Sequence, residues 1–154
     1  MKWLLYAVLG AIALVALVAA IGATLPRAHN ASRTLRVKRP PTEVWPAITA
    51  ATVASDVPVD VLENAPPHRL VTRVKETERN FGGTWTIVIA AEPQPQGSAT
   101  GSAGSAVTIT EDGWVANPIF RFVSRFVIGH HATMDGILRQ VARALNEAPA
   151  LSGE

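Results

Sequence analysis

The chain has 154 residues, which is enough for one ordinary domain and too few for two. It contains no cysteine, and this excludes a disulfide scaffold, a zinc ribbon, an iron–sulfur site and a cysteine nucleophile. The formal net charge is only +2, from 14 basic and 12 acidic residues, so a nucleic-acid partner is not expected.

The first feature along the chain is an uncharged apolar run over residues 3–25. As a helix rising about 1.5 Å per residue it would reach roughly 34 Å, enough to cross a hydrocarbon core of about 30 Å. Trp3 and Tyr6 lie at one end, where aromatic rings favour the membrane interface. The sequence therefore predicts a transmembrane anchor over residues 1–25 and a juxtamembrane linker over residues 26–30.

The orientation of this segment is predicted from the basic residues around it. Lys2 precedes the run, whereas five basic residues follow it closely: Arg27, Arg33, Arg36, Lys38 and Arg39. Positive residues near a span tend to stay cytoplasmic, so a single-pass anchor would place the soluble domain in the cytoplasm. The alternative is a cleaved secretory signal with Val18-Ala19-Ala20 as the cleavage site, after which the domain would be exported.

The soluble part begins with short periodic segments. Apolar residues at every second position predict strands over residues 32–39, 57–62, 69–75, 84–91 and 106–110. A short helix is expected over residues 42–51, because proline precedes it and apolar residues recur at helical spacing. The Pro-, Gly- and Ser-rich residues 93–104 are expected to form a loop, and Glu111-Asp112-Gly113 to end the last strand as a turn.

A long helix is expected to close the domain. Asn117-Pro118 is typical of a helix start, since Asn can cap the helix and Pro suits its first position. Apolar residues then recur at spacings of three and four as far as Leu145. This pattern predicts one long amphipathic helix, bent near Gly129. Together the elements predict an α+β domain in which a curved antiparallel sheet wraps the long helix.

Four stretches carry a resemblance to a known family: SRTLRVKRPPTEVW, VDVLENAPPHRLVTRV, FGGTWTIVI and VTITEDGWVANPIFRFVSRFVIGHHATMDGILRQVARAL. In this order they resemble the helix-grip fold of the START-like superfamily, also labelled SRPBCC or polyketide cyclase/dehydrase. The expected domain covers residues 31–148 and leaves residues 149–154 as a tail. The resemblance implies a cavity between sheet and helix that holds an apolar or amphipathic molecule, and it carries over no catalytic residues.

The sequence is shorter than this family pattern in one region. Residues 51–56 stand where members generally place two further strands and the loop that closes the cavity. Six residues cannot form a strand pair, since one strand takes about five or six. We therefore expect about five strands instead of seven, with the cavity open on that side or covered by a partner.

Six side chains are candidates to line the cavity under this resemblance: Trp45, Trp85, Phe122, Phe126, His130 and Met134. Ordinary core packing is the alternative for the aromatic rings. His130 lies on the apolar stripe of the expected helix, where it is either a buried neutral histidine or, in an enzyme, an acid or base. Trp114 is expected at the rim.

Two other pairs of polar residues have simple interpretations. His131 and Asp135 stand four residues apart and could hold a metal, but no third ligand has a matching spacing, so a hydrogen bond on the helix surface is expected. Glu111 and Asp112 are interpreted as turn residues and not as a general acid and base. No catalytic residue, metal site or cofactor is predicted.

The segment IFRFVSRFVI at the start of the expected long helix has a wide apolar arc around a narrow polar stripe. Such a segment can lie in the membrane interface, where Arg121 and Arg125 would meet anionic lipid. The alternative is that both apolar sides are buried, one by the sheet and one by a partner or by the membrane helix.

The sequence favours membrane-anchored binding of a hydrophobic small molecule or lipid in a helix-grip cavity, without catalysis. The expected partners are the lipid bilayer, the hydrophobic ligand and a second copy of the chain, with no nucleic acid. Two alternatives remain open: a cyclase- or dehydrase-like enzyme that uses His130, and an interaction module in which the open sheet binds another protein.

Overall fold

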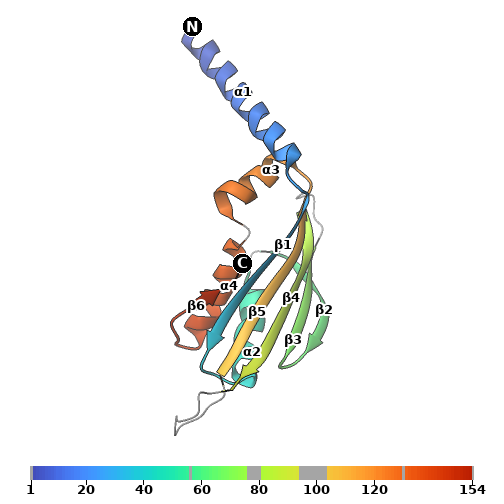
Figure 1. Cartoon of the computed structure of the whole chain (residues 1–154), viewed down its shortest axis with the longest axis vertical. Coiled ribbons are helices and arrows are strands. Elements are labelled where there is room, and N and C mark those ends of the chain that lie inside the picture. Colours follow the sequence, from blue (N-terminus) through green and yellow to red (C-terminus); the bar gives the residue numbers. More distant parts are fainter. Residues whose placement is uncertain (1, 56, 76–80, 94–103, 130, 154) are drawn as a thin grey trace.

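The computed structural model describes residues 2–55, 57–75, 81–93, 104–129 and 131–153. A long N-terminal helix extends away from an α+β domain (Figure 1). The helical elements are α1 (Lys2–Thr24), α2 (Pro41–Val53), α3 (Pro118–Val123), the π-helical turn η1 (Ser124–Ile128) and α4 (Ala132–Ala144). The strands are β1 (Ala28–Val37), β2 (Val59–Ala65), β3 (Arg69–Val74), β4 (Phe81–Glu92), β5 (Gly104–Val115) and β6 (Ala150–Ser152).

The six strands form one open antiparallel sheet in the order β2-β3-β4-β5-β1-β6. Strands β4 and β5 pair without interruption from Phe81↔Val115 to Glu92↔Gly104, and β1 pairs with β5 along its whole length. The long strands therefore lie in the middle of the sheet, and the short strands β2 and β6 form its edges.

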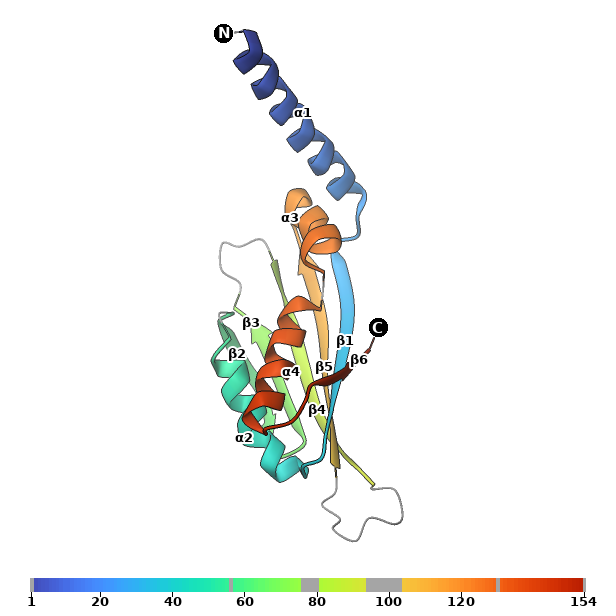
Figure 2. The same cartoon turned by 90° about the vertical axis from the view of Figure 1, so that its left-hand side faces the viewer.

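Helices α2 and α4 cover one face of this sheet (Figure 2). Alternate residues of the central strands point to that face, because side chains of a strand alternate between its two sides. They pack against Val44 and Ile48 of α2 and against Met134, Leu138 and Val141 of α4, all fully buried. This arrangement is a helix-grip α+β fold with an N-terminal apolar helix, as the sequence predicted.

The expected single long helix is broken into α3, η1 and α4, which corrects the sequence prediction. The π-helical turn ends at Gly129, which has a φ of 78°. A positive φ is open to glycine and costly for other residues, so the chain changes direction here instead of only bending. Helical structure resumes at Ala132. Of the three segments α3, η1 and α4, only α4 contributes buried residues to the hydrophobic core (Figure 2).

Strand β5 continues through Glu111-Asp112-Gly113, where the sequence predicted a turn. The reason is long-range pairing: β1 begins at Ala28, inside the expected linker, and pairs with the end of β5 from Ala28↔Trp114 onward. At the other end of the chain, residues 150–152 of the expected tail pair with residues 34–36 of β1.

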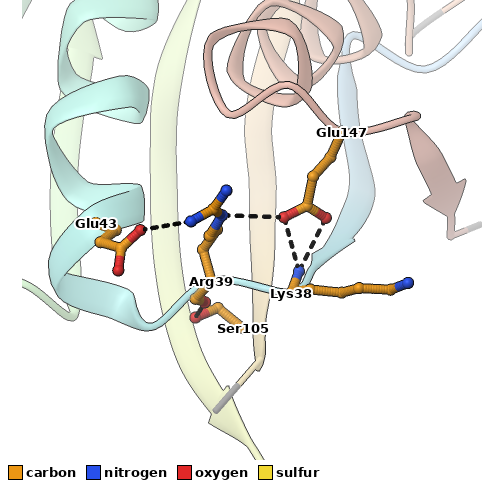
Figure 3. Close-up of polar contacts among 5 residues, drawn as sticks. All are labelled: Lys38, Arg39, Glu43, Ser105 and Glu147. Carbon is orange, nitrogen blue, oxygen red and sulfur yellow. Dashed lines mark hydrogen bonds and ion pairs between the residues drawn. The ribbon is translucent and has the colours of Figure 1, made fainter. Parts of the chain in front are cut away.

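A polar cluster fastens the end of the sheet that lies far from α1 (Figure 3). The Lys38 backbone N–H donates to both carboxylate oxygens of Glu147, at 3.1 and 2.9 Å. Arg39 lies 3.7 Å from Glu147 and 3.3 Å from Glu43, and its carbonyl accepts a 2.6 Å hydrogen bond from Ser105. The cluster ties the connection between β1 and α2 to the residues that follow α4.

Candidate functional site

A cavity of about 590 Å³ opens at the end of the sheet nearest α1. It lies between β4, β5, the α3–η1 segment and the start of α4, and its lining is mainly apolar. The apolar lining includes Val57, Val74, Phe81, Trp85, Phe120 and Val123. A larger hollow of about 730 Å³ at the opposite end has charged residues in its lining, among them Arg36, Lys38, Glu92 and Glu147.

Strands β4 and β5 carry smaller residues at the end near the cavity than farther along the sheet. Farther along these strands, the core-facing positions hold large aliphatic side chains, for example Ile87 opposite Ile109. Nearer α1, the same face carries Gly83 opposite Gly113, with no side chains. A Cβ atom on Gly83 would collide with the backbone of Asp112, so position 83 requires glycine. A Cβ on Gly113 would meet the imidazole ring of His29, which lines the cavity.

One polar pair stands in this apolar lining. Nε2 of His29 lies 3.5 Å from Oε1 of Glu111, and the two side chains are 17% and 19% exposed. His29 is opposite Gly113 in the β1–β5 pairing, and a Cβ on Gly113 would lie 2.7 Å from Cε1 of His29. The glycine therefore lets the imidazole ring lie across β5 and approach Glu111.

Helix α3 forms one wall of the cavity and is fastened to the end of α1. Arg121, only 7% exposed, donates from Nη1 to the Leu25 carbonyl at 2.7 Å and from Nη2 to the Ala116 carbonyl at 3.2 Å. The last turn of α1 also touches α3, since a Cβ on Gly22 would collide with the Pro118 carbonyl. Arg121 was expected to face lipid, and the structure instead buries it as a clamp between the two helices.

Several apolar side chains of this wall are exposed, and two of them, Phe120 and Ile128, also line the cavity. The exposed side chains form the α3–η1 patch, which consists of Ile119, Phe120, Phe126, Val127 and Ile128. Arg125 is exposed on the same segment. Because α3 is attached to the last turn of α1, the patch lies next to the point where the apolar helix ends (Figure 1).

The structure separates the predicted cavity residues into different environments. Trp85 lines the cavity and is buried. Trp45 packs against the core, and Met134 is fully buried within it, so neither lines the cavity. Phe126 is 60% exposed, and its ring lies 5.0 Å from the half-buried ring of Phe122.

His130, the sixth predicted cavity residue, falls outside the described residues. Trp114 lines the cavity and is partly exposed, as expected of a rim residue. The sequence analysis missed the pair of His29 and Glu111. A signal for Glu111 was present, since it continues the alternation of Val107 and Ile109 toward the core.

The expected hydrogen bond between His131 and Asp135 is absent, which corrects the sequence analysis. Asp135 instead forms ion pairs with Arg33 at 3.1 Å and Arg139 at 3.7 Å, and Nδ1 of His131 has no partner among the described residues. Within the described ranges, no group of three or more His, Asp or Glu side chains could hold a metal ion.

Fold and cavity together define the class of protein: a helix-grip α+β domain preceded by an apolar helix. No protein-family model matches the sequence, and no curated protein matches it. Among solved structures, a conserved protein from Geobacillus kaustophilus superimposes with a TM-score of 0.59, at 11% identity, over 80% of this chain and 99% of that chain. This likeness shows a shared fold.

Two further solved structures are similar at lower scores. CalU16 from Micromonospora echinospora has a TM-score of 0.49 at 13% identity, over 77% of this chain and 80% of its own. The di-domain ARO/CYC BexL from the BE-7585A biosynthetic pathway has a TM-score of 0.38 at 14% identity, over 82% of this chain and 49% of its own.

Proposed function

We propose that this chain is a membrane-anchored START-like protein that binds a hydrophobic small molecule or lipid, without chemistry of its own. The observation that carries the proposal is the apolar cavity of about 590 Å³. Ligand sites are typically concave, mostly apolar and about 300–1,000 Å³ in volume, with a few polar groups that orient the ligand. The order of elements and the shared helix-grip fold support the superfamily.

The place of the cavity supports a ligand taken from the bilayer. Helix α1 is long and apolar enough to cross a membrane, although a signal sequence has the same properties. With α1 in the bilayer, the Arg121 clamp holds α3 and the cavity mouth at the membrane surface. The α3–η1 patch would then lie in the interface, with Arg125 among the headgroups. The basic residues after α1 favour a cytoplasmic domain.

Native mass spectrometry of the full-length protein, extracted in detergent, tests the proposal. We expect a small hydrophobic molecule to remain bound and the neutral dye Nile red to compete with it. Val57→Trp places an indole in the cavity lining and should reduce binding of both. Val53→Trp is the matched control, because Val53 is 83% exposed and does not line the cavity.

Thermal unfolding of both variants should first establish that each is folded. If the folded wild type retains no small molecule and Nile red binds both variants equally, the cavity does not bind hydrophobic ligands and the proposal is wrong. Dye binding lost from Val57→Trp alone supports it.

A further inference from the structure

We infer that the cavity selects a ligand whose polar end is an uncharged hydroxyl group, and that Glu111 recognises this group. The inference rests on the proposed function, because it names the class of ligand for the same cavity. Three observations carry it: the charge of the lining, the chemistry of Glu111 and an unpartnered indole N–H.

The first observation is the set of ionisable side chains in the described lining. No Lys or Arg lines the cavity within the described residues, and the ionisable groups there are His29 and Glu111. The pair of His29 and Glu111 therefore supplies no net positive charge. A carboxylate or phosphate headgroup would meet the Glu111 carboxylate without a Lys or Arg in the described lining to offset it, in apolar surroundings where charges are weakly screened.

The arginines near the end of α1 line a neighbouring hollow and not the cavity itself. Arg27, Arg121 and Arg125 line a third hollow of about 150 Å³ against the end of α1, which shares His29, Val115 and Ser124 with the cavity. Arg121 is already engaged with the carbonyls of Leu25 and Ala116. Positive charge thus gathers on the α1 side of α3, and Glu111 lies in the cavity lining.

The second and third observations favour a hydroxyl over an ester or an ammonium group. A carboxylate only accepts hydrogen bonds, so a ligand group that pairs with Glu111 has to be a donor. Trp85 is directly opposite Glu111 in the β4–β5 pairing, and its Nε1–H is buried with no partner among the described residues. An indole N–H only donates, so it requires an acceptor. A hydroxyl supplies both, whereas an ester only accepts and an ammonium only donates.

The test compares two probes with the same hydrocarbon chain, oleyl alcohol and oleate, at mildly alkaline pH. Each probe displaces Nile red from the full-length protein in nanodiscs of a zwitterionic lipid. We expect oleyl alcohol to bind about tenfold more tightly than oleate, the order of one hydrogen bond to a charged acceptor. Glu111→Gln should bring this ratio to about threefold or less, chiefly because oleate binds better.

Asp112→Asn is the matched control, because Asp112 is the next residue of β5 and its exposed side chain does not line the cavity. It removes the same charge from the chain and should leave the ratio unchanged. Equal binding of both probes, or an unchanged ratio in Glu111→Gln, overturns the inference while the proposed function stands. Failure of both probes and of Nile red to bind overturns the proposed function as well.

Discussion

Replacing Arg121 with methionine tests whether the clamp couples the apolar helix to the cavity wall. Methionine keeps much of the apolar stem and removes the guanidinium, which makes two hydrogen bonds of 2.7 and 3.2 Å. After the change, the carbonyls of Leu25 and Ala116 lose their charged donor. We expect α3 to detach from the end of α1 more often, with little effect on the core between α2, α4 and the sheet.

The size of this effect follows from the bonds that are lost. Hydrogen bonds to charged groups contribute about 1.5–3 kcal/mol each, and water can replace part of this at the partly open end of α1. A net loss of about 2 kcal/mol is therefore expected for the closed arrangement of α3. This corresponds to an increase of about 30-fold in the opening equilibrium constant.

Amide hydrogen exchange of the full-length protein in nanodiscs measures this opening directly. The amides of residues 118–123 should lose protection by about that factor in Arg121→Met, while those of α4 should not change. Arg125→Met is the matched control, because Arg125 is exposed on the same segment, and its effect should stay within about 0.5 kcal/mol. Unchanged protection in Arg121→Met, or equal loss in both variants, would show that apolar packing and not the clamp holds α3.

Three further predictions concern other parts of the molecule. The full-length chain should stay in the membrane pellet after a carbonate wash, and recovery of a mature chain that begins near Ile21 would instead establish a signal peptide. Glu147→Ala should lower the unfolding free energy by about 1 kcal/mol, because Lys38 loses its acceptor, whereas the exposed Glu43→Ala should cost less than about 0.5 kcal/mol in the same thermal melts. The edge strand β2 should support weak self-association in sedimentation, and Val61→Lys should abolish it; a wild type that stays monomeric at every concentration would contradict this.

Much of the fold could be predicted because its signals are local. The period-2 pattern that ends in Leu35 and Val37 marks β1, and the pair Asn117-Pro118 marks the start of α3. In the structure the Asn117 side chain accepts hydrogen bonds from the N–H groups of Ile119 and Phe120, as a helix cap does. These features depend on residues close together in the sequence.

The candidate site was harder to predict because it depends on strand register. Glu111 and Gly113 have the local chemistry of a turn, and pairing with β1 overrides it. His29 meets Glu111 only because residue 29 falls opposite residue 113, which no pattern within either segment specifies. The break at Gly129 was only partly visible, since a glycine permits a positive φ and does not require one.

The two ends of the sheet have different roles: one end is closely packed, and the other contains the cavity proposed to bind a ligand. The end far from α1 combines fully buried aliphatic residues such as Ile89 and Val107 with the polar cluster around Glu147. The end near α1 instead has two facing glycines, Gly83 and Gly113, and the ionisable pair of His29 and Glu111. A region in which polar groups replace apolar packing is typical of a functional site. The well-packed part of the fold then supplies the stability that this region lacks. The position of this region beside the apolar helix is what the proposed uptake of a ligand from the bilayer requires.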